Sequence, residues 1–266
     1  MKATTLRNGF VSCAIALALV GTFGIITPVF ADPDPAKCKA NSPNARCHVV
    51  VSFGGQSFDV DADIDGQGKG KINNRLLTAQ NGKLSAIINA EFDPDPVIIF
   101  SVAFTNNTAA PAGFAMAFDE PINLNGLIAA TSSVGYTLTD GDANGVILAP
   151  TAPNTRVVVA NDVQANLNQV NKGVNVGPQV SGGSAPCSAF AGGTSVCGPF
   201  TAANTFSGGP FVDMSVIVSF LLTPNDAAGL SGRVTQDAVP EPGTLLLMGT
   251  GLVGLMGGWR RYFVRT

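Results

Sequence analysis

The sequence predicts a mainly β protein, an antiparallel β-sandwich or jelly-roll with long loops. Runs of β-branched and aromatic residues, which favour strands, recur along the middle of the chain. They occupy residues 49–53, 97–104, 156–160 and 211–222. Turn-forming pairs of asparagine and glycine lie between the runs. They occur at residues 73–74, 81–82, 106–107 and 144–145. Few stretches repeat apolar residues every 3.6 positions, so the middle of the chain is not expected to be helical.

Phenylalanine is the main aromatic residue and is expected to fill the core. The chain has 16 phenylalanines, against two tyrosines and one tryptophan. The expected core members are Phe53, Phe58, Phe100, Phe104, Phe114, Phe118 and Phe220. Residues 171–210 are rich in glycine, serine, alanine and proline, so we expect a long loop there.

The N-terminal segment has the three parts of a secretory signal peptide, which we assign to residues 1–31 as a helical segment. Basic residues Lys2 and Arg7 precede an apolar run at residues 10–26. Small residues follow, and they predict cleavage between Ala31 and Asp32. An uncleaved membrane anchor is the alternative, but a proline at position 28 breaks the helix just before the cleavage site.

Export gives the cysteines a structural meaning, because oxidising compartments favour disulfides. Four cysteines beyond the signal peptide allow three connectivities. We favour the two local pairs, Cys38–Cys47 and Cys187–Cys197, which lie nine and ten positions apart. A zinc site is not expected, because neither pair has two-residue spacing and the chain has one histidine.

Charge excludes nucleic acid as a partner. The whole chain has a net charge of −3, and five of its 15 basic residues lie in the two terminal segments. The exported domain, residues 32–237, is therefore more acidic than the whole chain. An acidic surface repels phosphate backbones, so we expect no nucleic-acid binding.

The C-terminal tail, residues 238–266, carries three features in order. Pro240-Glu241-Pro242 is followed by an apolar stretch at 244–258 and by a basic cluster. That cluster consists of Arg260, Arg261 and Arg265. The tail resembles the PEP-CTERM sorting signal. The resemblance implies an exported protein of a Gram-negative bacterium, whose tail is processed by an exosortase, a membrane-embedded cysteine transpeptidase-like enzyme.

The apolar stretch also predicts a transmembrane helix at about residues 244–264. Residues 244–258 span roughly 22 Å as a helix, less than the bilayer core of about 30 Å. Residues 259–264 supply the remaining length, with the arginines reaching the headgroups. The positive-inside rule then places the C-terminus in the cytoplasm and the acidic domain outside the inner membrane.

Two aspartate-rich turns fit the opening of a calcium-binding loop, D-x-[DN]-x-[DN]-G. The first holds Asp61, Asp63 and Asp65, and the second holds Asp140, Asp142 and Asn144. Both lack the closing glutamate, with Ile72 and Thr151 at the twelfth positions. Alternatively, these residues only shape surface turns. Calcium is thus the one cofactor that the sequence suggests, and otherwise none is expected.

We expect no catalytic residues. His48 is the only histidine and lies beside Cys47, and no nucleophile elbow, Walker loop or metalloprotease helix is present. Asp93 and Asp95 alternate with prolines and indicate a turn rather than an acid–base pair.

The sequence therefore predicts an exported, non-catalytic protein of the cell surface or extracellular matrix, associated with biofilm or exopolysaccharide. Its expected partners are the export machinery, the exosortase and, transiently, the inner membrane. A polysaccharide-binding module, possibly stabilised by calcium, is the alternative function. That alternative lacks the usual aromatic platform for a sugar ring, because Trp259 lies in the tail and Tyr136 is the one tyrosine of the exported domain.

Overall fold

The computed structural model describes residues 38–39, 46–165, 169–179, 187–190, 192–239 and 250. The predictions for the signal peptide, its cleavage site and residues 240–266 of the tail lie outside these residues, apart from Thr250. Apart from Thr250, which is helical, the secondary structure of the described part consists of β-strands. Among the described residues, no helix is found that is long and apolar enough to cross a membrane. The prediction of a mainly β, antiparallel protein is confirmed.

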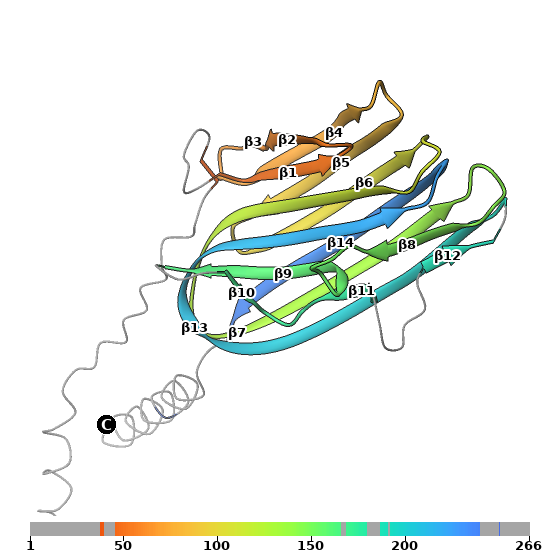
Figure 1. Ribbon diagram of the computed structural model, residues 1–266. Helices are drawn as coiled ribbons and strands as arrows, with labels where there is room; N and C mark the ends of the chain where they lie inside the picture. Colours follow the sequence, from red (N-terminus) through yellow and green to blue (C-terminus); the bar gives the residue numbers. More distant parts are fainter. Residues whose placement is uncertain are drawn as a thin grey trace, which may run out of the picture. The chain divides into compact units, whose positions relative to one another are not determined.

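Fourteen strands belong to one hydrogen-bonded sheet (Figure 1). They are β1 (His48–Phe53), β2 (Gln56–Asp61), β3 (Asp63–Ile64), β4 (Gly70–Ala79), β5 (Leu84–Asp93), β6 (Val97–Asn106), β7 (Ala112–Thr139), β8 (Val146–Pro150), β9 (Arg156–Gln164), β10 (Gln169–Asn171), β11 (Val176–Gln179), β12 (Cys187–Ala189), β13 (Thr194–Leu222) and β14 (Asp226–Ala238). The main strand order is β10-β9-β13-β7-β14-β6-β5-β4-β3. The other strands pair outside this order: β1 pairs with β7 and β2, β11 pairs with β9, and β8 pairs with β12 and β13.

Two long strands, β7 and β13, bend and contribute to both layers of the sheet (Figure 1). The first part of β7 pairs with β1, and its later part pairs with β14. The later part of β13 pairs with β9, whereas its first part pairs with the later part of β7. The bend falls near Gly126 and Gly208, whose φ angles of 87° and 150° favour glycine. Bulges beside Gly208 increase the local twist.

We call the two halves the first and second layers. The first layer contains β1, β2, β8, β9, β10, the beginning of β7 and the end of β13. The second layer contains β4, β5, β6, β14, the end of β7 and the beginning of β13. Phenylalanine rings join the layers: Phe104 of β6 lies 4.9 Å from both Phe114 of β7 and Phe220 of β13. The layers therefore pack face to face, as in a β-sandwich.

Strict alternation of buried and exposed residues creates this shared core. In β6 the even-numbered residues from Ile98 to Asn106 are buried, as are the even-numbered residues from Ala112 to Glu120 in β7. Of the seven phenylalanines expected in the core, six are buried, and Phe58 packs against the core partly buried. Each fully buried ring contributes roughly 1.5–3 kcal/mol of transfer free energy.

Two disulfides fasten the ends of strands. Cys38 is bonded to Cys47, just before β1, and Cys187 of β12 is bonded to Cys197 of β13. These are the two local pairs favoured by the sequence. The predicted long loop between 171 and 210 is only partly irregular, because β11, β12 and the first part of β13 lie within it.

Candidate functional site

The aspartate-rich turn after β7 is organised by the carboxylate of Asp140. Its Oδ1 accepts the N–H of Asp142 at 3.2 Å, and its Oδ2 accepts the N–H groups of Gly145 at 3.0 Å and Gly192 at 2.5 Å. Burial raises the pKa of Asp140, but the backbone N–H donors outweigh burial and lower it to about 2. Asp140 is therefore ionised at neutral pH and fixes this turn against the segment that precedes β13.

The structure adds a third carboxylate to this turn, that of Asp226 at the start of β14. One carboxylate oxygen from each of Asp140, Asp142 and Asp226 lies within 4.8 Å of the others. The N–H of Gly141 donates to Asp226 Oδ1 at 3.1 Å, and the Asn225 amide donates to Asp142 Oδ2 at 3.0 Å. The β7–β8 and β13–β14 turns thus meet in an oxygen-rich group, the type that hard cations prefer.

The local sequence motif does not indicate Asp226, because this residue lies 85 positions after Gly141, whose N–H it accepts. The only signal was its place in a turn after a strand-forming run. Asn144 of the same turn is exposed. Burial raises the pKa of Asp226, and the negative charges of Asp140 and Asp142 act in the same direction.

The first aspartate-rich turn does not gather its carboxylates. Asp61 closes β2 and accepts a hydrogen bond from Arg46 Nε at 2.8 Å. Asp63 lies in β3, and Asp65 accepts the N–H of Lys69 at 2.9 Å, which lowers its pKa. Across the described ranges, the only acidic group of three or more with a metal-like spacing is the one around Asp140.

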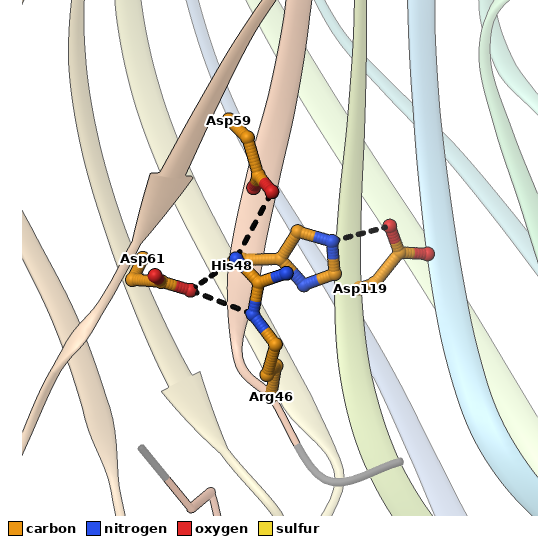
Figure 2. Close-up of polar contacts among 5 residues, drawn as sticks. All are labelled: Arg46, His48, Asp59, Asp61 and Asp119. Atoms are coloured by element: carbon orange, nitrogen blue, oxygen red, sulfur yellow. Dashed lines mark hydrogen bonds and ion pairs between the residues drawn. The ribbon is translucent and has the colours of Figure 1, made fainter. Parts of the chain in front are cut away.

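His48 belongs to a polar group with Arg46, Asp59, Asp61 and Asp119 (Figure 2). Arg46 bridges Asp59 and Asp61, with Nη2 3.0 Å from Asp59 Oδ2. The His48 Nε2 lies 3.7 Å from Asp119 Oδ2. This group connects the start of β1 to β2 and β7.

The register of the first layer argues against a catalytic triad around His48. Asp119 lies between His48 on one neighbouring strand and Ser215 on the other. Histidine and serine are therefore two strands apart, roughly 9–10 Å. The imidazole is out of reach of the serine hydroxyl, so it cannot serve as its base.

A mixed-charge hollow of about 360 Å³ lies on the outer face of the second layer. Its polar lining includes Asp63, Asp65, Lys69, Lys71, Glu91 and Arg233. Lys71 pairs with Glu91 at 2.8 Å, whereas Arg233 has no ion pair with any residue that the structure describes. Ile99, which is 38% exposed, lies between Glu91 and Arg233 in the same cross-strand row. The hollow thus offers hydrogen-bonding groups of both signs around an apolar patch.

The β-sheet ends just before the predicted sorting motif. The last strand, β14, ends at Ala238, and the N–H of Val239 donates to the Leu127 carbonyl at 2.8 Å. Pro240 comes next in the sequence and has no N–H with which to continue the ladder. Residues 238–261 match the family described as the PEP-CTERM protein-sorting motif.

The chain carries a PEP-CTERM sorting motif. The resemblance predicted from the tail is thereby confirmed, and the match starts at the last residue of β14. The PEP-CTERM motif implies export and a C-terminal, membrane-anchoring sorting tail. The predicted sorting residues lie outside the described part of the chain, as do those of signal cleavage. The sorting residues are Pro240, Glu241, Pro242, Arg260, Arg261 and Arg265, and the cleavage residues are Ala31 and Asp32.

Among curated proteins, none matches this PEP-CTERM chain. Two solved structures align with it at low similarity. TmCBM61 in complex with β-1,4-galactotriose aligns at 8% identity and a TM-score of 0.24, over 57% of this chain and 88% of that one. The CBM22-1–GH10 modules of Clostridium thermocellum xylanase 10B, complexed with xylohexaose, align at 9% identity and a TM-score of 0.27. That alignment covers 74% of this chain and 29% of the xylanase. Neither likeness establishes a shared function.

Proposed function

We propose that this protein is an exported, non-catalytic component of the cell surface or extracellular matrix, associated with biofilm or exopolysaccharide. An exosortase sorts it and processes its C-terminal tail. The observation that carries the proposal is the PEP-CTERM motif at residues 238–261, which begins where the last strand ends.

The junction between sheet and tail supports processing at this position. Pro240 and Pro242 lack backbone donors and favour an extended backbone. They therefore separate the hydrogen-bonded end of β14 from the apolar segment that follows. An extended segment beside the membrane can be gripped by an exosortase while the folded domain remains outside.

Other features agree with export and with a non-catalytic role. Disulfides at Cys38–Cys47 and Cys187–Cys197 suit an oxidising compartment. His48 is separated from Ser215 by the strand that carries Asp119, so it does not form a nucleophile–base pair. We therefore assign no catalytic residue. We also propose cleavage of the signal peptide after Ala31 and a transient inner-membrane anchor at about residues 244–264.

The test is mass spectrometry of the protein recovered from the cell surface and from the inner membrane. The surface form of the wild-type chain should begin at Asp32 and lack Arg265-Thr266. A Pro240→Ala, Pro242→Ala double variant should keep Arg265-Thr266 and remain in the inner membrane, as should Glu241→Ala. Asp237→Asn, an exposed change just before the motif, is the matched control and should be processed normally. A surface form that retains Arg265-Thr266 would contradict the proposal.

A second candidate function, polysaccharide binding, is favoured by the hollow on the second layer. Sugar hydroxyl and carboxylate groups need donors and acceptors, and this hollow provides charged side chains of both signs. Arg233 is exposed beside Ile99, where a guanidinium can donate two parallel hydrogen bonds to a sugar acid.

Binding of the full chain to exopolysaccharide from the producing cells tests this function. We expect Arg233→Ala to weaken binding about tenfold, the effect of losing roughly 1.4 kcal/mol. Arg75→Ala, which removes an exposed arginine of β4, should leave binding unchanged. If Arg233→Ala and Arg75→Ala bind the polysaccharide equally well, the hollow is not the binding site.

A further inference from the structure

We propose that Asp140, Asp142 and Asp226 bind one Ca²⁺ ion, which links the β7–β8 turn to the β13–β14 turn. This site goes beyond the sorting function and does not depend on it. It uses two residues of the predicted second calcium turn and replaces Asn144 with a carboxylate from a distant part of the chain.

The separations of the three carboxylates match the size of a calcium coordination shell. Calcium binds oxygen at 2.3–2.6 Å, so two ligands on opposite sides of one ion are about 5 Å apart. One oxygen each from Asp140, Asp142 and Asp226 lies within 4.8 Å of the others. A single ion can therefore contact all three side chains without rearrangement of the strands.

An unpartnered oxygen at the buried side of the group indicates that a ligand is missing. Asp226 is 1% exposed, and its Oδ2 accepts no hydrogen bond. Its Oδ1 is already used by the N–H of Gly141. Native proteins rarely leave a buried carboxylate oxygen without a donor or a cation, because its desolvation is then uncompensated.

No protein cation neutralises the group. Over the described ranges, lysine and arginine form ion pairs with Asp59, Asp61, Asp93, Glu91 and Asp162, but with none of the three acids of this site. The side-chain donors that the structure describes beside the group are neutral: the Asn225 amide donates to Asp142 Oδ2, and the Thr223 hydroxyl lies beside Asp226. Three carboxylates with oxygens within 4.8 Å of one another repel each other, and a divalent cation removes that repulsion.

The backbone around the group is fixed before any ion binds. A Cβ atom on Gly141 would lie 2.1 Å from the Asn225 carbonyl oxygen, so only glycine allows the two turns to approach this closely. Ala143 and Asn225 adopt φ angles of 63° and 55°, in the left-handed region that costs most residues energy. Such local strain is maintained where the surrounding structure, here the network around Asp140, holds the turn in place.

The ligand chemistry selects Ca²⁺ among common metal ions. All three side chains offer oxygen, which favours hard cations over zinc or copper. The ligands come from two turns in irregular geometry, and calcium tolerates such geometry, whereas Mg²⁺ requires a near-ideal octahedron. Water and backbone carbonyl groups would complete the six to eight ligands of the ion.

The test is calorimetric titration of CaCl₂ into the full chain, purified in detergent and stripped with EDTA, together with thermal unfolding. We expect one ion per chain, with Kd roughly 10⁻⁴–10⁻³ M, as in extracellular modules. At 10 mM CaCl₂ the Tm should rise by roughly 3–10 °C. Asp226→Asn and Asp142→Asn should each weaken binding at least about tenfold and abolish most of the Tm shift.

Asp237→Asn is the matched control, because it removes an exposed acid from the same strand as Asp226; it should bind calcium like wild type. If Asp226→Asn does not fold, the calcium titration of Asp142→Asn tests the proposal, because Asp142 is exposed. The proposal is overturned if the wild-type chain shows no saturable binding, or if Asp142→Asn binds like wild type. It is also overturned if Asp237→Asn weakens binding as much as the site variants. Tail processing of Asp142→Asn, followed by mass spectrometry, should stay normal, which separates this proposal from the sorting function.

Discussion

The side-chain amide of Gln236 donates a 2.6 Å hydrogen bond to the carboxylate of Asp162, and this bond joins the two layers through the core. Gln236 lies on β14 of the second layer, and Asp162 lies on β9 of the first. Neither residue is exposed to solvent. The Lys172 Nζ lies 3.8 Å from Asp162 Oδ2 and 3.4 Å from the centroid of the Phe211 ring. A polar network therefore crosses the core between the two layers.

Replacing Gln236 with leucine should destabilise the protein by about 1.5–3 kcal/mol, because the buried Asp162 carboxylate loses a donor. The loss should exceed any gain from the apolar side chain, since an unsatisfied buried charge is costly. The free energy of unfolding in urea measures the effect. Gln169→Leu, on an exposed position of β10, should change it by less than about 0.5 kcal/mol. Equal effects of both changes would mean that the interlayer bond contributes nothing.

Stability should fall as pH rises from about 4.5 to 7.5. Burial raises the pKa of Asp162 to about 6, although Gln236 and Lys172 oppose it. Burial also raises the pKa of Asp213 to about 7, with the charges of Asp119 and Asp162 adding to the shift. Both folded pKa values exceed the ordinary value of 3.8. The folded state thus binds more protons than the unfolded state in this window. The stabilisation that these protons provide is lost as pH rises through 6–7.

Buried Glu120 acts in the same direction, because neither of its carboxylate oxygens has a hydrogen-bond partner and burial raises its pKa. Asp140 acts in the opposite direction, but only below about pH 4, because its pKa is lowered to about 2. The unfolding free energy should decrease by roughly 5 kcal/mol between pH 4.5 and 7.5, about 2 kcal/mol from Asp162 and about 3 kcal/mol from Asp213. Asp213→Asn should flatten the upper part of this profile, whereas Asp237→Asn should leave it unchanged. A stability that rises steadily over this range would contradict the assignment.

The class of the fold could be predicted from local patterns, but the bent strands could not. The run at 211–222 predicted a strand, and the structure extends it back to Thr194 as β13. The residues before 211 include Gly208, Gly209 and Pro210, which in isolation indicate a turn. Pairing of this segment with the equally long β7 stabilises the extended conformation. Long-range pairing of this kind leaves no periodic signal in either segment alone.

The same limit applies to the candidate cation site. A local motif was sufficient to select Asp140 and Asp142, because both belong to one turn. Asp226 could not be added, because its approach depends on the return of β14 beside β7 and on the contact between Gly141 and the Asn225 carbonyl. Sites formed by two turns require the topology of the sheet before their ligands can be counted.

Gly232 occupies a position where a single methyl group should be costly. It lies opposite Phe100 on β6, and a Cβ atom there would approach Phe100 Cζ to 2.3 Å. Phe100 stacks on Phe118 with ring centroids 5.1 Å apart, so it cannot move aside freely. Gly232→Ala should lower the unfolding free energy by roughly 1–3 kcal/mol.

Gly229, on the same strand, provides the control for this change. A Cβ atom on Gly229 would meet Thr137 at 3.8 Å, an ordinary contact. Gly229→Ala should therefore be neutral or slightly stabilising, because alanine restricts the unfolded chain. If both alanine variants unfold at the same urea concentration, Phe100 does not pack as closely against Gly232 as we infer.

The disulfide between Cys187 and Cys197 should contribute about 2–3 kcal/mol, because it closes a loop of about ten residues in the unfolded chain. It also borders Gly192, whose N–H donates to Asp140. The Cys187→Ser, Cys197→Ser double variant should therefore unfold at lower urea and bind Ca²⁺ more weakly than wild type. The Cys38→Ser, Cys47→Ser variant removes a loop of similar length elsewhere and should lose comparable stability while its calcium affinity is unchanged. Equal loss of calcium affinity in both variants would show that affinity follows global stability rather than the position of the segment before β13.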